Sequence, residues 1–206
     1  MNAAVVISGR MGAGKSTLLR ALIEHAPETT RCMTITIDRK PKAADVVHPT
    51  RADWSEFNHV TPDYFDALIE TEQLLVPAKQ EQKDFRVGFL YATIESVLGF
   101  GGLVLLNMPP AYFDPVRMLF AQYRRTVHGF YLDVPEAVVH ARLLRRGAGE
   151  EEARMKMRLT ADWRDQAKAL GFTLIENPEE DDHYPHQALE AVLKKLGTTT
   201  ELIPVA

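Results

Sequence analysis

Cysteine is almost absent from this chain of 206 residues, in which Cys32 is the only one. A single thiol excludes an intramolecular disulfide and a four-thiolate zinc site, so we expect a reducing compartment. No segment approaches 18 consecutive apolar residues, and no basic stretch precedes the short apolar run at the N-terminus. We therefore expect a cytoplasmic protein with neither a membrane span nor a signal peptide.

A large excess of charge of either sign is also missing. The formal net charge is -4, which argues against a broad electrostatic contact with nucleic acid or an anionic membrane. Any phosphate recognition must then be local. The length fits one domain with a proper core and room for a small insertion, and we expect a monomer or a homodimer.

Short apolar runs alternate with segments of helical periodicity along most of the chain. Runs bounded by glycine, proline or polar residues predict strands, and helix start signals such as Thr61 followed by Pro62 predict helices. This alternation favours an α/β fold with a doubly wound, mostly parallel, five-stranded sheet. The predicted strands are 3–8, 32–37, 101–110, 127–134 and 171–177, and the predicted helices are 15–25, 61–71, 135–146 and 184–196.

A glycine-rich loop stands between the first predicted strand and the first predicted helix. The stretch "GRMGAGKST" satisfies the P-loop pattern, in which backbone N–H groups surround phosphates, the lysine reaches the β- and γ-phosphates, and the serine ligates Mg²⁺. An ordinary glycine turn would leave the Lys-Ser-Thr succession unexplained. We expect ATP and Mg²⁺ to bind here, with Ser16 on the metal, through Gly9, Met11, Gly12, Ala13, Gly14, Lys15, Ser16 and Thr17.

The order of features after this loop resembles the guanylate kinase family of nucleoside monophosphate kinases. "TITIDRKPK", "HVTPDYFDALIETEQLL", "ARLLRRG", "MRL" and "IEN" are similar to the family's segments and follow in the same order. The resemblance implies a P-loop NTPase fold with a small acceptor-binding insertion and a lid. It divides the chain into a kinase core at 1–38 and 91–197, with the lid at about 146–158, an acceptor region at 39–90 and a tail at 198–206.

The resemblance also implies roles for particular residues. The arginines Arg142, Arg146 and Arg158 match those that surround the transferring phosphoryl group, where guanidinium groups stabilise charge on its oxygens. A solvated helix end is the alternative for these arginines. Asn177 matches the asparagine near the adenine base, and Arg39 and Lys42 match basic residues that hold the phosphate of a small phosphorylated acceptor.

The acceptor half departs from the family pattern. Val76 stands where the family has a glutamate that reads guanine, "RVGF" replaces "YYGT", and "NMP", with Asn107, replaces an acidic signature. A site that reads a base by buried hydrogen bonds needs those partners. We expect Asn107 to contact the acceptor, and Glu72, Glu81 or Asp84 to be candidates for the missing carboxylate.

Asp38 follows the second predicted strand, where the family has threonine or serine. A monophosphate acceptor attacks with an anionic oxygen, whereas a hydroxyl acceptor benefits from a base, which makes Asp38 a candidate catalytic base. The alternative is that Asp38 caps a turn or pairs with Arg39 or Lys40. We expect an ATP-dependent kinase of a nucleoside monophosphate such as GMP or dGMP. One alternative is a kinase of a ribose phosphate or of a hydroxyl-bearing nucleoside or modified base, and another is a nucleotide-binding module without turnover.

Overall fold

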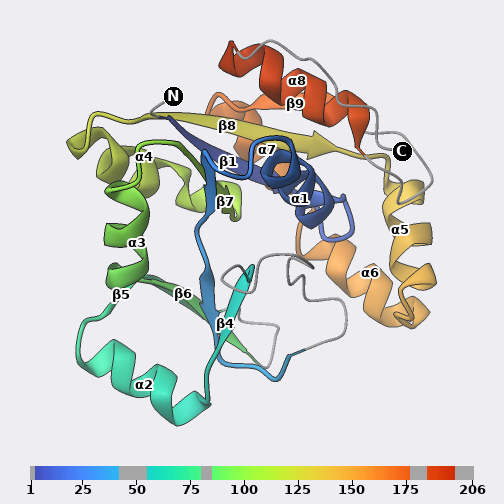
Figure 1. Ribbon diagram of the computed structural model, residues 1–206. Helices are drawn as coiled ribbons and strands as arrows, with labels where there is room; N and C mark the ends of the chain where they lie inside the picture. The colour runs from blue at the N-terminus through green and yellow to red at the C-terminus, as the bar shows by residue number, and fades with distance from the viewer. Residues whose placement is uncertain (1–2, 42–54, 80–84, 177–184, 198–206) are drawn as a thin grey trace.

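The computed structural model describes residues 3–41, 55–79, 85–176 and 185–197, which form two sheets surrounded by helices (Figure 1). The strands are β1 (Ala3–Gly9), β2 (Thr30–Cys32), β3 (Ile35–Ile37), β4 (Phe57–His59), β5 (Leu74–Lys79), β6 (Arg86–Leu90), β7 (Leu103–Asn107), β8 (Thr126–Asp133) and β9 (Thr173–Glu176). The helices are α1 (Lys15–His25), α2 (Pro62–Glu70), α3 (Tyr91–Leu98), the 3-10 turn η1 (Pro110–Tyr112), α4 (Phe113–Gln122), α5 (Glu136–Arg145), α6 (Glu150–Arg158), α7 (Trp163–Ala169) and α8 (His186–Leu196).

The central sheet has the order β2-β7-β1-β8-β9, and all its neighbouring strands are parallel. Val5 in β1 lies in register with Leu105 of β7 and His128 of β8. Helices cross over between these strands, as parallel pairing requires. The prediction of a five-stranded parallel α/β sheet is confirmed.

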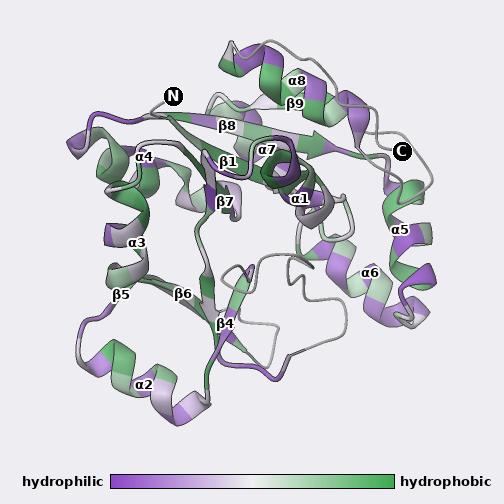
Figure 2. Ribbon diagram, in the orientation of Figure 1, coloured by the Kyte–Doolittle hydropathy of each residue, from purple (hydrophilic) through white to green (hydrophobic). Residues whose placement is uncertain are grey.

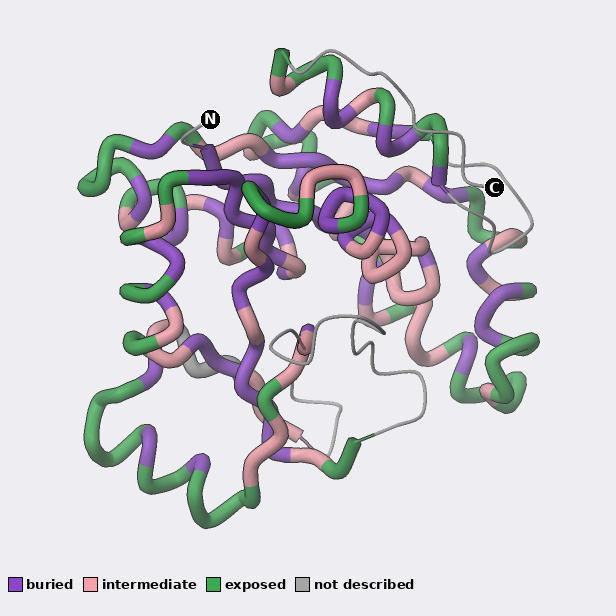
Figure 3. The backbone as a smooth tube through the Cα atoms, in the orientation of Figure 1, coloured by how far each residue is buried: buried purple, intermediate pink, exposed green. Residues whose placement is uncertain are grey.

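Both faces of this sheet are buried, which explains why its strands read as continuous apolar runs. Along β1, Val5 and Ile7 pack in one hydrophobic cluster with α1, α5 and α8, while Ala4 and Val6 pack in a second with α3, α4 and α7. The alternation follows from the two-residue period of a strand. Figure 2 shows apolar residues along β1 and alternating apolar and polar residues along the helices, and Figure 3 shows β1 buried.

The predicted strand at 32–37 is divided between two sheets, which corrects the sequence interpretation. The N–H of Met33 still donates to the carbonyl oxygen of Leu105 in β7 at 2.8 Å. From Thr34 onward the partners change: its Oγ1 donates to the Ser55 carbonyl at 2.9 Å, and the N–H of Ile35 donates to the Glu56 carbonyl at 3.0 Å. The chain leaves the central sheet here and enters the second one.

The second sheet has the order β4-β3-β6-β5 and mixes parallel and antiparallel pairs. Helix α2 packs on it through a small core of Phe65, Leu68 and Leu74. The start of α2 agrees with its sequence signal, because Thr61 accepts a hydrogen bond from the N–H of Tyr64 at 3.2 Å. Strands β4, β5 and β6 were not predicted from the sequence.

The helices α1, α2, α5 and α8 lie close to their predicted positions, whereas α3, α4 and α7 were not predicted. Helix α6 continues from α5 after a short glycine-containing turn and packs against it. None of the helices in the described ranges is long and apolar enough to cross a membrane.

Candidate active site

The P-loop joins the end of β1 to the start of α1. Gly9, Gly12 and Gly14 have φ angles of +147°, +87° and +97°, which side chains rarely tolerate. A Cβ atom on Gly9 would also lie 3.0 Å from the carbonyl oxygen of Leu132 in β8. Glycine is therefore required at Gly9 for the close approach of the loop to the neighbouring strand.

The N-terminus of α1 can bind an anion. No side chain caps this end, and its first turn carries no acidic residue. The partial positive charge of the first backbone N–H groups after Gly14 is therefore available to an anion. Ser16 and Thr17 lie in this first turn and are half-buried. Met11 lies in the loop and is also half-buried.

Lys15 folds back over the loop from which it starts. Its Nζ donates to the carbonyl oxygens of Gly9 at 3.0 Å and Arg10 at 2.9 Å. Burial lowers the pKa of Lys15 to about 8, an effect opposed by the carboxylate of Glu56 and reinforced by the guanidinium of Arg146. The ammonium is thus held among these charges beside the phosphate loop.

Two of the predicted arginines are brought to this loop by α5. Arg142 is only 2% exposed, and its Nη1 donates to the carbonyl oxygen of Ala13 at 3.3 Å. Arg146 caps the C-terminus of the same helix and acts electrostatically on Lys15. The solvated helix end considered as an alternative does not describe Arg142, whose guanidinium contacts the P-loop.

A cavity of about 930 Å³ lies beside the loop, between α5 and α6. Arg158 lines it from α6, and Arg10 lines it from the P-loop, where it pairs with Glu136 at 2.6 Å. His140 of α5 and Glu150 of α6 also line the cavity, with Nε2 of His140 3.2 Å from Oε1 of Glu150. This volume is in the range of small-molecule sites. Arg10 and Glu136 were not predicted from the sequence, because a salt bridge between residues 126 positions apart leaves no local signal.

Asn107 ends β7 at the same edge of the sheet as the P-loop, in register with Ile7 of β1. Its Nδ2 donates to Oε1 of Glu56, which is 2% exposed. Glu56 was not identified from the sequence. Together with Ser16, these residues offer oxygen atoms, the ligand type that Mg²⁺ prefers, so the donor set fits that ion.

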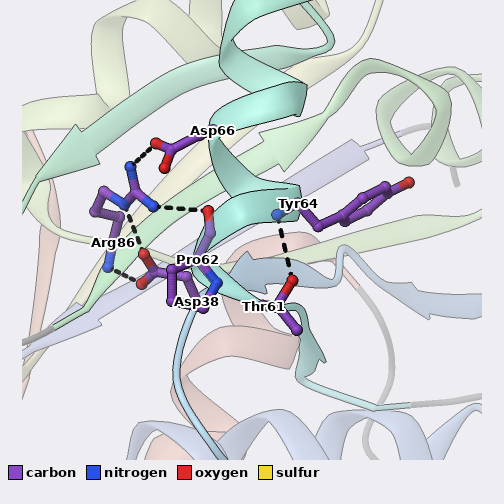
Figure 4. A network of polar contacts seen from close by, with 6 residues as sticks. All are labelled: Asp38, Thr61, Pro62, Tyr64, Asp66 and Arg86. Atoms are coloured by element: carbon purple, nitrogen blue, oxygen red, sulfur yellow. Dashed lines mark hydrogen bonds and ion pairs between the residues drawn. The ribbon is translucent and has the colours of Figure 1, made fainter.

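On the acceptor side, Asp38 does not pair with Arg39 or Lys40 but with Arg86 (Figure 4). Arg86 donates from Nε to Oδ2 of Asp38 at 2.6 Å and from its backbone N–H to Oδ1. The same guanidinium donates to Asp66 and, at 3.0 Å, to the carbonyl oxygen of Pro62 in α2. A role of Asp38 as a base would require this network to open.

Arg39 lies beside two aromatic rings of the second sheet region. Its guanidinium carbon is 5.2 Å from the ring centre of Phe57 and 5.8 Å from that of Phe85. Its Nη1 donates to the carbonyl oxygen of Lys40 at 3.0 Å. Stacking of this kind orients a guanidinium, and the assignment of Arg39 to the acceptor phosphate stays a prediction.

Several residues named from the sequence lie elsewhere. Glu72 is exposed in the turn after α2, with a φ of +52°, and Phe89, the last residue of "RVGF", is buried in the hydrophobic core. Val76 belongs to β5. Lys42, Glu81, Asp84 and Asn177 lie outside the described residues.

Comparison with known proteins decides the family. No family model matches the chain. The guanylate kinase of Thermosynechococcus vestitus is 31% identical over 153 residues, which cover 72% of this chain and 72% of that protein. The chain belongs to the guanylate kinase family. The guanylate kinase of Synechocystis sp. is 28% identical to this family member over 197 residues, covering 94% of the chain and 92% of its relative.

Solved structures agree on the fold of this guanylate kinase family member. The crystal structure of guanylate kinase from Anaplasma phagocytophilum aligns with a TM-score of 0.61 at 14% identity, covering 97% of this chain and 88% of that one. At that identity the likeness supports the fold alone. The family assignment from sequence relatives and the intact P-loop make the chain an ATP-dependent, nucleoside monophosphate kinase-like enzyme.

Proposed function

We propose that this chain transfers the γ-phosphoryl group of Mg·ATP to a small phosphorylated acceptor, with a nucleoside monophosphate as the leading acceptor. The observation that carries the proposal is the convergence of Lys15 and Arg142 on the backbone of one P-loop. Phosphoryl transfer needs little covalent chemistry from the protein, and fixed positive charges around the phosphates provide most of the catalysis.

Each residue of the donor half has a distinct task in this proposal. The N–H groups at the start of α1 bind the phosphates, and Lys15 exchanges the carbonyl oxygens of its own loop for phosphate oxygens. Arg142 and Arg146 stabilise charge on the transferring group. Bound Mg²⁺ would neutralise part of the charge on the β- and γ-phosphates. Helix α6 lines the cavity beside Arg158, and its movement toward bound ATP would exclude water from the phosphates.

The charges on the acceptor side favour an acceptor that needs no base. Both oxygens of Asp38 accept hydrogen bonds from Arg86, so this carboxylate is already engaged. The phosphate of a monophosphate attacks with an oxygen that is already anionic, and Arg39 can hold it beside the second sheet. These contacts support a nucleoside monophosphate over a hydroxyl-bearing nucleoside.

A screen of acceptors tests the proposal. Purified protein is incubated with Mg·ATP and, in turn, GMP, dGMP, the other monophosphates, ribose phosphates and free nucleosides, and both ADP release and product mass are followed. We expect a nucleoside diphosphate product from one or more monophosphates. Turnover with a ribose phosphate or a nucleoside alone would replace the acceptor class, and ATP binding without any turnover would indicate a binding module.

A further inference from the structure

The carboxyl end of β7 lacks an acidic residue where P-loop enzymes place one. In P-loop NTPases the magnesium ion is held by the P-loop serine or threonine and by an aspartate elsewhere at the site. Here β7 ends at Asn107, and its amide cannot supply a negative charge. Because Asn107 is neutral, β7 does not provide the carboxylate that would normally balance the charge of the magnesium ion.

Glu56 brings a carboxylate to that same position from the other sheet. Its backbone carbonyl accepts a hydrogen bond from the N–H of Ile35 at 3.0 Å, which fixes the residue immediately before β4. Its side chain then reaches across to Asn107, whose Nδ2 donates to Oε1. At 2% exposure the residue is among the few buried acidic ones in the described part of the chain.

Burial of this carboxylate is costly unless a positive charge compensates it. The amide of Asn107 satisfies hydrogen bonding but not charge. The ammonium of Lys15 interacts electrostatically with Glu56, and Ser16 is the next residue in the chain. Its hydrogen bond to Asn107 and its attraction to Lys15 place the carboxylate between the end of β7 and the P-loop, where phosphates and a divalent cation would bind.

We propose that Glu56 supplies the acidic group of the magnesium site, held in place by Asn107. This inference rests on the proposed function. Magnesium usually keeps several of its waters and is bound by one or two carboxylates together with substrate phosphates, so a single carboxylate in addition to the Ser16 hydroxyl suffices. The described residues contain no group of three or more His, Cys, Asp or Glu side chains that could hold a metal without the nucleotide.

The test measures metal binding rather than turnover. Mn²⁺ replaces Mg²⁺ as a paramagnetic probe, and free Mn²⁺ is quantified by electron paramagnetic resonance in the presence of the non-hydrolysable analogue AMP-PNP. Glu56→Gln keeps the shape and removes the charge, so we expect Mn²⁺ affinity in this complex to fall about 10- to 100-fold. Glu95→Gln, on the exposed face of α3, is the control and keeps the affinity of the parent chain.

Binding of AMP-PNP without metal separates a metal role from general damage. Loss of a nearby negative charge leaves this affinity equal or higher, because the nucleotide phosphates are also negative. The double variant Glu56→Gln with Asn107→Asp places a carboxylate at the end of β7 instead. We expect its Mn²⁺ affinity to lie within about threefold of that of the parent chain, which is clearly different from the 10- to 100-fold loss in Glu56→Gln alone. Three results would each overturn the inference. The first is an unchanged Mn²⁺ affinity in Glu56→Gln, and the second is an equal loss of AMP-PNP affinity without metal. The third is a double variant that folds but does not recover Mn²⁺ affinity.

Asn107→Asp alone keeps the inference testable if Glu56→Gln does not fold. A second carboxylate beside Glu56 increases Mn²⁺ affinity about tenfold if this is the metal site, since an opposite charge within about 4–6 Å shifts an ionisation equilibrium by about tenfold or more. No change would overturn the assignment. A parent chain that fails to bind AMP-PNP with Mn²⁺ overturns the proposed function itself, which distinguishes the two failures.

Discussion

Arg86 joins Asp38 to α2: its Nε donates to Oδ2 of Asp38 at 2.6 Å while the same guanidinium donates to Asp66 and to the carbonyl oxygen of Pro62. The Asp38 side chain is 6% exposed and that of Asp66 is 55% exposed. The two carboxylates thus have very different access to water. Figure 4 shows the guanidinium between them.

The first prediction concerns this ion pair. Arg86→Met leaves the buried Asp38 carboxylate without its cation, so we expect the free energy of unfolding to fall by about 2–4 kcal/mol. Asp66→Asn removes an exposed partner and costs less than about 1 kcal/mol. Urea denaturation measures both variants.

A double-mutant cycle with Asp38→Asn sharpens the first prediction. Because both single changes break the same pair, the loss in the double variant is smaller than the sum of the two. If Asp38→Asn instead leaves stability intact and lowers kcat by about 100-fold or more, Asp38 acts as a base and the structural role is wrong.

The second prediction concerns Lys15. Lys15→Ala removes the cation nearest to the P-loop carbonyls, so we expect kcat/KM for phosphotransfer to fall about 100- to 1,000-fold. Coupled measurement of ADP release gives this value. Lys168→Ala, exposed on α7, is the control and retains the parental rate. Equal and negligible rates in the parent chain and the Lys15 variant would instead indicate a binding module.

The third prediction concerns Arg142. Arg142→Lys keeps the charge but loses the planar set of donors, so we expect kcat to fall at least about 100-fold. Single-turnover kinetics separate this loss from a change in ATP binding. Arg145→Ala changes an exposed arginine of the same helix and keeps the parental kcat. A parental kcat in a folded Arg142→Lys variant would assign Arg142 to loop stability alone.

The fourth prediction concerns acid sensitivity. Burial, with a smaller effect of Lys195, lowers the pKa of His128 in β8 below the ordinary value of 6.5. The unfolded chain therefore takes up this proton first, and the folded chain loses stability as the pH falls through 6.5. His128→Gln should reduce the drop in the urea midpoint between about pH 7.5 and pH 5.5, a range that spans this pKa. An identical drop in the parent and the variant would show that His128 does not contribute.

Much of the donor site could be predicted because its residues are adjacent in the chain. The P-loop is one stretch from Gly9 to Thr17, and its glycine angles and its helix start depend on local backbone geometry. The central sheet was also predictable, since buried parallel strands leave continuous apolar runs. Family likeness extended the prediction to Arg142, which the structure places against Ala13.

What the tertiary structure alone decided is which distant polar groups meet. Asp38 and Arg86 are 48 residues apart, and Glu56 and Asn107 are 51 apart. Nothing in the local pattern distinguishes Glu56 from an exposed acid, because Glu56 is buried where the chain, after leaving the central sheet at Thr34, pairs with the segment before β4. The sequence by itself determined the phosphate loop and the parallel core. Which carboxylate lies beside the end of β7 was determined by the packing of the second sheet, which brings Glu56 to Asn107.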